Sequence, residues 1–393
     1  MLRERCGGCG STALKTFLDL GQTPLAGDFV TQDSDPQQWM HLALGACEEC
    51  WLVQQMWIVD DDELFTEEYP STSSFDAQYH QELAKLLMER HEEQLNRGPV
   101  VEIGSNDGDL LQHFDLAGHK SIGIDPAANV GMRSPVYRTF DGRFNLALAR
   151  KIKKQEGEAG LIIVKNTVDR VENLDNFFSG LNTLLSPFGL VIIETPYLGS
   201  MILGNQFAEV MHERRYHFSI DAIWRLGEQH GLFVENVEMR DGNMRLTLGR
   251  NGPSFGVTEL RREEEWLRLK ATYDGVQGRV NFIKERIVEL VEREKIAGRR
   301  VAAFGATNEG MTLLMFCGLN ANKIEYVVDP TLTRAGTATP GAMIPVVKPG
   351  ELPSPDTYVL LAWNYLGQML RAGSEFLNHG GRFLVPLPNP FIV

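Results

Sequence analysis

An α/β fold with two separate parallel sheets is predicted by three observations. Short apolar runs alternate with amphipathic segments across residues 98–250; the runs are VVEIG, SIGID, LIIVKN and LVIIETP. The alternation restarts at 299 with RRVAAFGA, IEYVVDP, TYVLLAW and RFLVPLP, after a charged stretch with helical spacing. Residues 1–60 are instead rich in turns. We therefore expect an N-terminal module at 1–60, an α/β domain at 61–257, a helical connector at 258–298 and a second α/β domain at 299–393.

The composition is that of a soluble globular protein, and it excludes some partners. The chain has 393 residues and a formal net charge of -14, which argues against nucleic acid because a phosphate backbone needs a basic surface. No apolar run approaches the roughly 18 residues of a membrane span, and the first residues lack an apolar signal core. We expect a cytoplasmic protein, a monomer or small homo-oligomer, that acts on a small molecule without nucleic-acid or membrane partners.

The N-terminal module contains two C-x-x-C pairs, Cys6 with Cys9 and Cys47 with Cys50. Two thiolates at this spacing bind one tetrahedral ion from a tight loop, and two such pairs complete a closed site without a position for catalysis. A redox pair or free thiols would be the alternative, but two pairs in one small module favour structural zinc. Zinc would stabilise a segment too short to form its own core.

A ligand site is predicted where the strand VVEIG runs into the loop SNDGDLL. Gly104 and Gly108, with Asn106 between them, allow the backbone to approach a ligand, and a helix follows. A dinucleotide loop would have a third glycine. Glu102 near the strand end instead suits the positively charged methionine end of S-adenosylmethionine (SAM). The alternative is an ordinary strand–turn–helix unit in which Glu102 caps the helix.

Four further positions are predicted to line this site. Asp125 ends the next strand, where a carboxylate can bind both ribose hydroxyls of a nucleoside. Phe140 and Asp141 are placed to border the adenine, and Asn166 ends LIIVKN at the carboxyl edge of the sheet.

The order of motifs resembles a known family over nearly the whole chain. The matching segments are CGGCGSTALKTFLDLGQTPLAGDFV, CEEC, VVEIGSNDGDLL, DPAANV and the C-terminal FGATNEGMTLL, VVDPT, PGAMIPVVKPGEL and LAWN. They resemble C-methyltransferases of nucleotide-linked 4-keto deoxysugars from natural-product and polysaccharide biosynthesis. The resemblance implies a zinc domain, a Rossmann-like SAM-dependent methyltransferase domain and a second Rossmann-like domain that helps bind the nucleotide sugar. It also implies a base that removes the proton beside the ketone.

The central segment departs from the family pattern Y-H-E-H. Here it reads Met211-His212-Glu213-Arg214, so the family's tyrosine and second histidine, the usual base, are replaced. Arginine remains protonated and cannot act as a general base. We therefore consider Glu213, His217 and His212 as candidate catalytic residues. Glu213 can equally form an ordinary ion pair, and His217 can simply pack beside Phe218.

Other substitutions suggest a second hypothesis about the acceptor. Arg170 and Arg214 occupy positions that resemble family histidines, and guanidinium groups there would bind a carboxylate or phosphate. Arg245 and Asn308 are further candidate substrate-binding residues, the latter in the turn GATNEG beside Glu309. The alternatives are a methyltransferase for an anionic small molecule with an O, N or C nucleophile, and a SAM-binding protein without transfer activity.

Overall fold

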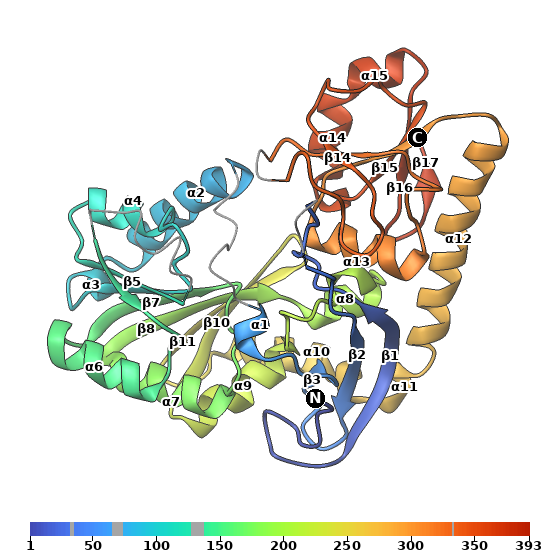
Figure 1. Ribbon diagram of the computed structural model, residues 1–393. Coiled ribbons are helices and arrows are strands. Elements are labelled where there is room, and N and C mark those ends of the chain that lie inside the picture. The colour runs from blue at the N-terminus through green and yellow to red at the C-terminus, as the bar shows by residue number, and fades with distance from the viewer. Residues whose placement is uncertain (32–34, 65–73, 127–136, 332–333) are drawn as a thin grey trace.

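The computed structural model describes residues 1–31, 35–64, 74–126, 137–331 and 334–393, and it confirms the α/β fold class. Figure 1 shows the N-terminal module in dark blue between the large central sheet and the C-terminal domain. Residues 127–130 of the motif DPAANV lie outside the described residues. None of the helices in the described ranges is sufficiently long and apolar to cross a membrane.

The N-terminal module is a four-stranded antiparallel sheet with an unexpected member. Three strands come from the first 60 residues, and the fourth comes from the segment that follows Met211-His212-Glu213-Arg214. The order is β1 (Leu14–Thr23), β2 (Met40–Cys47), β3 (Val53–Gln55) and β9 (Tyr216–His217). Val53 pairs with His217 and Gln54 with Tyr216. A two-residue strand has no periodicity of its own, so the sequence did not predict this pairing.

The central sheet has seven strands, of which five are parallel. Its order is β10 (Phe233–Arg240), β11 (Asn243–Gly249), β8 (Leu185–Pro196), β7 (Ala159–Lys165), β4 (Val100–Ile103), β5 (Ser121–Asp125) and β6 (Arg138–Asp141). β10 and β11 form an antiparallel hairpin beside β8. Every residue of β4 and β5 is buried, as expected of parallel strands covered on both faces.

Helices cover both faces of this sheet, and polar side chains determine where several of them begin. Asn145, Asn173 and Ser219 each accept a hydrogen bond from a backbone N–H of the helix that follows. The helices of the domain, after the short α1 (Asp61–Leu64), are α2 (Ser74–Arg90), α3 (Glu92–Leu95), α4 (Leu111–Leu116), α6 (Leu146–Glu156), α7 (Leu174–Leu184), α8 (Leu198–Leu203), η1 (Phe207–Glu209) and α9 (Ile220–Gln229).

The strand order reverses at β4, which has β5 on one side and β7 on the other. In an open sheet of this kind, a crevice forms beyond the carboxyl ends of the strands where the strand order reverses. The carboxyl ends of β4, β5, β6 and β7 share this edge, which is therefore the expected ligand site.

The connector is helical and belongs to the core. It consists of α10 (Phe255–Glu263), η2 (Glu265–Arg268), α11 (Lys270–Tyr273) and α12 (Val276–Ile296). α12 packs against β1 and against the C-terminal domain, as Figure 1 shows. Its buried residues Val280, Ile283 and Ile287 share one hydrophobic cluster with Leu18 of the N-terminal module and Leu314 of the C-terminal domain.

The C-terminal domain contains the second sheet, with six strands. Their order is β14 (Val346–Val347), β13 (Val327–Val328), β12 (Val301–Phe304), β15 (Thr357–Leu360), β16 (Arg382–Val385) and β17 (Phe391–Ile392), and only β17 is antiparallel to its neighbour. The accompanying helices are α13 (Asn308–Cys317), η3 (Trp363–Tyr365), α14 (Leu366–Ala372) and α15 (Ser374–Asn378). Thr312 of α13 donates a hydrogen bond to the carbonyl of Val210, the residue directly before Met211. This bond joins the C-terminal domain to the start of the central segment.

Candidate active site and zinc centre

The four cysteines of the N-terminal module form one cluster. Their Sγ atoms all lie within 4.8 Å of one another; Cys6 is 3.5 Å from Cys50, and Cys9 is 3.6 Å from Cys47. Four thiolates around a tetrahedral zinc ion, each with a Zn–S bond of about 2.3 Å, have sulfur–sulfur separations of roughly 3.8 Å. The residues therefore fit zinc with all four positions occupied by protein ligands.

The contacts within the cluster favour a thiolate at Cys6, whereas burial raises the pKa of Cys9 and the hydrogen bond to Cys6 raises the pKa of Cys50. A hydrogen bond from Cys50 is the largest of the effects that lower the pKa of Cys6 to about 4, and the amide of Gln54 also contributes. The Gln54 Nε2 atom donates to Cys6 Sγ at 3.3 Å. Ligation by zinc requires thiolates, and the Gln54 amide is one donor that stabilises the thiolate of Cys6.

Glu102 lies where a cation is expected. It is a buried residue of β4, and its Oε2 atom has no hydrogen-bond partner among the described residues. Burial raises the pKa of this carboxyl well above its ordinary range, with Asp125, Asp107 and Asp109 adding repulsion and Lys165 opposing it. A buried carboxyl without a partner is costly, and the cationic methionine end of SAM would relieve that cost.

The loop after Glu102 has the backbone conformation that close approach to a ligand requires. Gly104 and Gly108 both have φ of +78°. A Cβ atom on Gly104 would lie 2.2 Å from Thr167 Oγ1. Asn106 also has a positive φ, and its backbone N–H donates to Asp125 Oδ2 at 2.8 Å. The loop therefore orients the carboxylate that we expect to bind ribose.

The remaining predicted SAM positions lie along the same edge of the sheet. Asp141 is in register with Asp125, and Phe140 is buried beside it in β6. Asn166 follows β7 with φ of +48°, and its N–H donates to the carbonyl of Glu194. The structure thus brings these residues to the carboxyl edge together with Glu102.

Proton release is expected when SAM binds, because a cation beside Glu102 favours its carboxylate. The pKa of this group is raised above 4.5 in the protein without ligand, so SAM affinity should increase with pH from that value through the raised pKa. Calorimetry in buffers of different ionisation enthalpy measures the protons released. Glu102→Gln should bind more weakly and release none; a variant that releases as many protons as the wild type would contradict this assignment.

The two histidines of the central segment are buried and weakly basic. His212 lies against the N-terminal module, with Nε2 3.4 Å from the carbonyl of Met40, and burial lowers its pKa to about 4. His217 lies in β9, where burial and then the charge of Arg214 lower its pKa to about 3. Both imidazoles are therefore neutral near pH 7 and are poor acceptors of a proton from carbon.

The two arginines predicted to bind an anionic acceptor have carboxylate partners within the protein. Arg170 Nη1 lies 3.2 Å from Glu213 Oε2. Arg214 is buried, and its Nε atom donates to Asp169 Oδ2 at 3.0 Å. Asp169 and Arg170 belong to the loop that begins at Asn166, so these ion pairs connect the central segment to the loop that follows β7.

Glu209 was missed by sequence reasoning, although it lies in the same cluster. Its side chain is 20% exposed, and Oε2 accepts a hydrogen bond from Arg214 Nη1 at 3.4 Å. Burial raises the pKa of Glu209 to about 7, and the carboxylates of Glu309 and Asp169 add to this effect while Arg214 opposes it. A lone glutamate outside the family motif gives no sequence signal, because Asp169 and Glu309, the carboxylates that act on it, come from distant segments.

The C-terminal turn approaches this cluster from the other side. Asp329 Oδ2 accepts a hydrogen bond from the backbone N–H of Ala306 at 2.5 Å and lies 3.9 Å from the guanidinium of Arg334. Burial lowers the pKa of Arg334, and the charges of Glu309 and Glu213 oppose this effect. Asn308 begins α13, and its buried Oδ1 atom has no hydrogen-bond partner within the described ranges.

Arg245 occupies a buried network in the central sheet. Its Nε donates to Glu194 Oε2 at 3.0 Å and its Nη2 to the Tyr79 hydroxyl at 2.7 Å, and Tyr79 donates in turn to Glu194 at 2.5 Å. A weaker contact of 3.4 Å reaches Glu238. The structure thus gives Arg245 internal partners from α2, β8 and β10.

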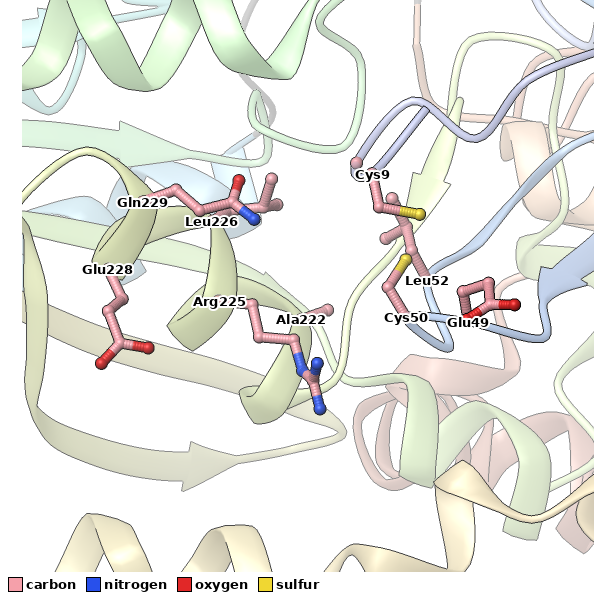
Figure 2. A pocket seen from close by; sticks show the side chains of 10 residues that line it. Cys9, Glu49, Cys50, Leu52, Ala222, Arg225, Leu226, Glu228 and Gln229 are labelled. Atoms are coloured by element: carbon pink, nitrogen blue, oxygen red, sulfur yellow. The ribbon is translucent and has the colours of Figure 1, made fainter. Parts of the chain in front are cut away.

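A separate cavity of about 360 Å³ lies between the zinc cluster and α9. Figure 2 shows Cys9 and Cys50 on one side and Ala222, Arg225, Leu226 and Gln229 on the other. It is distinct from the edge of the sheet where Glu102 and Asp125 lie. Nothing in its lining identifies a ligand.

Comparison with known proteins assigns each part of the chain to a family. Residues 6–65 match the "Putative zinc binding domain" model, residues 75–237 the "Methyltransferase domain" model, and residues 239–388 the "C-methyltransferase C-terminal domain" model. C-methyltransferase NovU of Streptomyces niveus is 31% identical over 408 residues, which cover 99% of this chain and 97% of the relative.

Solved structures also resemble part of the chain. The PH0226 protein of Pyrococcus horikoshii is 15% identical with a TM-score of 0.37, covering 45% of this chain and 92% of its own. CcbJ methyltransferase of Streptomyces caelestis is 11% identical with a TM-score of 0.35, covering 43% and 88%. The family models, the full-length relative and the cluster of four cysteines confirm the two expected cofactors, SAM and structural zinc. The chain belongs to the SAM-dependent C-methyltransferases that combine a zinc-binding domain, a methyltransferase domain and a C-methyltransferase C-terminal domain.

Proposed function

We propose that the protein methylates the carbon beside the ketone of a nucleotide-linked 4-keto deoxysugar. The observation that carries this proposal is the likeness to a C-methyltransferase over 99% of the chain, including the C-terminal domain. SAM supplies an electrophilic methyl group. The protein must bind the acceptor, exclude water and accept the proton that leaves the acceptor carbon.

Glu209 is the proposed base. A base for this step needs a pKa near the working pH, and the pKa of Glu209 is raised to about 7. Its partner Arg214 also binds Asp169, which lies three residues after Asn166 at the carboxyl edge of the sheet. Glu209 thus replaces the family histidine in function, while Arg214 orients it. Glu213, paired with Arg170, is the second candidate.

The ion pairs favour a neutral reacting group over an anionic group beside Arg170 and Arg214. An acceptor carboxylate or phosphate would have to displace Glu213 from Arg170, or Asp169 and Glu209 from Arg214. A neutral ketone carbon needs no such exchange. The hypothesis of an anionic small-molecule acceptor therefore becomes the alternative. Turnover with any acceptor would exclude a SAM-binding protein without transfer activity. The Asn308 side chain, whose buried Oδ1 atom has no hydrogen-bond partner within the described ranges, is proposed to contact the nucleotide.

The test is turnover of thymidine diphosphate 4-keto-6-deoxyglucose with SAM. We expect S-adenosylhomocysteine and a product that gains one carbon-bound methyl group, identified by mass spectrometry and NMR. Thymidine diphosphate glucose, which has no ketone, is the matched control and should not react. Turnover only with small carboxylates or phosphates, or methylation of oxygen in both sugars, would overturn the proposal.

A further inference from the structure

The N-terminal module, here called the zinc module, takes the fourth strand of its sheet from the segment 211–217, which contains Arg214. β9 is the fourth strand of this sheet, and its residues pair with Val53 and Gln54 of β3. The N–H of Gln55 also donates to the carbonyl of Arg215 at 2.9 Å. Residues around position 214 therefore have their backbone position set by the zinc module as well as by the methyltransferase domain.

Gln54 connects this strand pairing directly to the zinc ligands. Its side chain is fully buried; Oε1 accepts a hydrogen bond from the Gly7 N–H at 2.9 Å, and Nε2 donates to Cys6 Sγ at 3.3 Å. Its backbone pairs with Tyr216. One residue thus contacts the first cysteine loop with its side chain and the central segment with its main chain.

The Tyr216 ring packs tightly against the same cysteine loop. A Cβ atom on Gly7 would lie 2.3 Å from the Tyr216 hydroxyl oxygen and 2.7 Å from a ring carbon. The guanidinium of Arg3 lies over the ring at 5.1 Å, and its Nε donates to the carbonyl of Gln55 at 2.8 Å. The loop between Cys6 and Cys9 is therefore shaped around this ring.

The opposite side of the segment faces the SAM domain. The Tyr216 N–H donates to the carbonyl of Asp169, and the Asp169 carboxylate accepts from Arg214. Glu213 pairs with Arg170 of the same loop. The segment is thus held between the zinc loop and the loop that follows β7, and it cannot shift without breaking contacts on one side.

We propose that Gln54 is a positioning residue through which the zinc tetrathiolate fixes residues 211–217 against the loop at 166–170. Zinc then supports acceptor turnover without contacting SAM or the acceptor. Removal of this link leaves SAM binding intact, since Glu102 and Asp125 belong to other strands. Hydrogen-bond partners of metal ligands commonly change activity by about 10–100-fold when they are replaced.

The test compares Gln54→Met with the wild-type holoenzyme in buffer containing excess zinc. We expect four-thiolate zinc binding to persist, S-adenosylhomocysteine affinity to stay within about twofold, and amides of residues 211–217 to exchange hydrogen at least about tenfold faster. Arg5→Met is the matched control, because it removes the hydrogen bond to the carbonyl of Gly10 beside the first cysteine pair and leaves the hydrogen bonds of Gln54 and Tyr216 in place. Unchanged exchange in Gln54→Met would overturn the proposal.

Two further measurements separate positioning from general stability. Gln55→Met removes the side-chain bond to the carbonyl of Met211 without contacting a thiolate, and it should loosen the same amides at full zinc content. Zinc removal by a chelator should loosen residues 211–217 while S-adenosylhomocysteine still binds. Loss of that binding would show that zinc maintains the whole fold, which overturns the proposal. With an acceptor, KM for SAM should stay constant while kcat falls. The exchange and binding measurements need no acceptor, so they stand even if the proposed sugar substrate fails.

Discussion

Replacement of Glu209 by glutamine is expected to lower kcat for methyl transfer by about 10²–10⁴-fold, because the amide cannot accept a proton from the acceptor carbon. Glutamine keeps the size of the side chain and a hydrogen-bond acceptor for Arg214, so binding of S-adenosylhomocysteine should not change. Steady-state formation of S-adenosylhomocysteine with the keto sugar measures the loss. A decrease of only a few-fold would exclude Glu209 as the base and direct attention to Glu213.

The pH dependence gives an independent check on Glu209. A base must be deprotonated, and the pKa of Glu209 is raised to about 7, so kcat should increase with pH through that value. The charge of Glu309 contributes to the raised pKa. Glu309→Gln should therefore shift this limb of the profile to lower pH, whereas a limb that stays in place would show that another group titrates.

Replacement of Arg245 by methionine is expected to destabilise the methyltransferase domain by about 3–5 kcal/mol. Its partner Glu194 is 8% exposed and would remain buried without a guanidinium partner. The midpoint of thermal unfolding should fall by roughly 5 °C or more, measured by circular dichroism on zinc-loaded protein.

Two control variants show whether the buried charge causes this loss. The double variant Arg245→Met with Glu194→Gln removes both charges and should recover much of the stability, since an amide is less costly to bury than an unpaired carboxylate. Tyr79→Phe removes only a hydroxyl from the network and should cost about 1–3 kcal/mol. If the double variant is no more stable than Arg245→Met, lost packing rather than charge is responsible.

The parts of the fold that repeat along the chain were predictable from sequence. Continuous apolar runs such as LIIVKN became buried parallel strands, because helices on both faces exclude water from every side chain. The cysteine spacing predicted the zinc cluster, since two thiolates on one tight loop have few geometric alternatives. Glu102 and Gly104 were recognisable because strand, carboxylate and turn are adjacent in sequence.

The organisation of the acceptor site depends on contacts that adjacency does not reveal. Arg214 looked like a free cation from its sequence neighbours, yet Asp169 lies 45 residues away and reaches it through the fold. The pairing of β3 with β9 is equally distant in sequence. The charge state of Glu209 depends on Glu309 in another domain, so no local pattern could have predicted its raised pKa.

The pairing of β3 with β9 also has a consequence for the order in which the nascent chain acquires structure. The cysteines and β1 to β3 leave the ribosome first, while residues 216–217 follow only after most of the central sheet has been synthesised. Until then β3 has an open edge, and such edges invite pairing with other chains. Early capture of zinc by the four thiolates would hold the short β3 in place until its partner arrives, so metal supply during translation bears on the yield of correctly assembled enzyme.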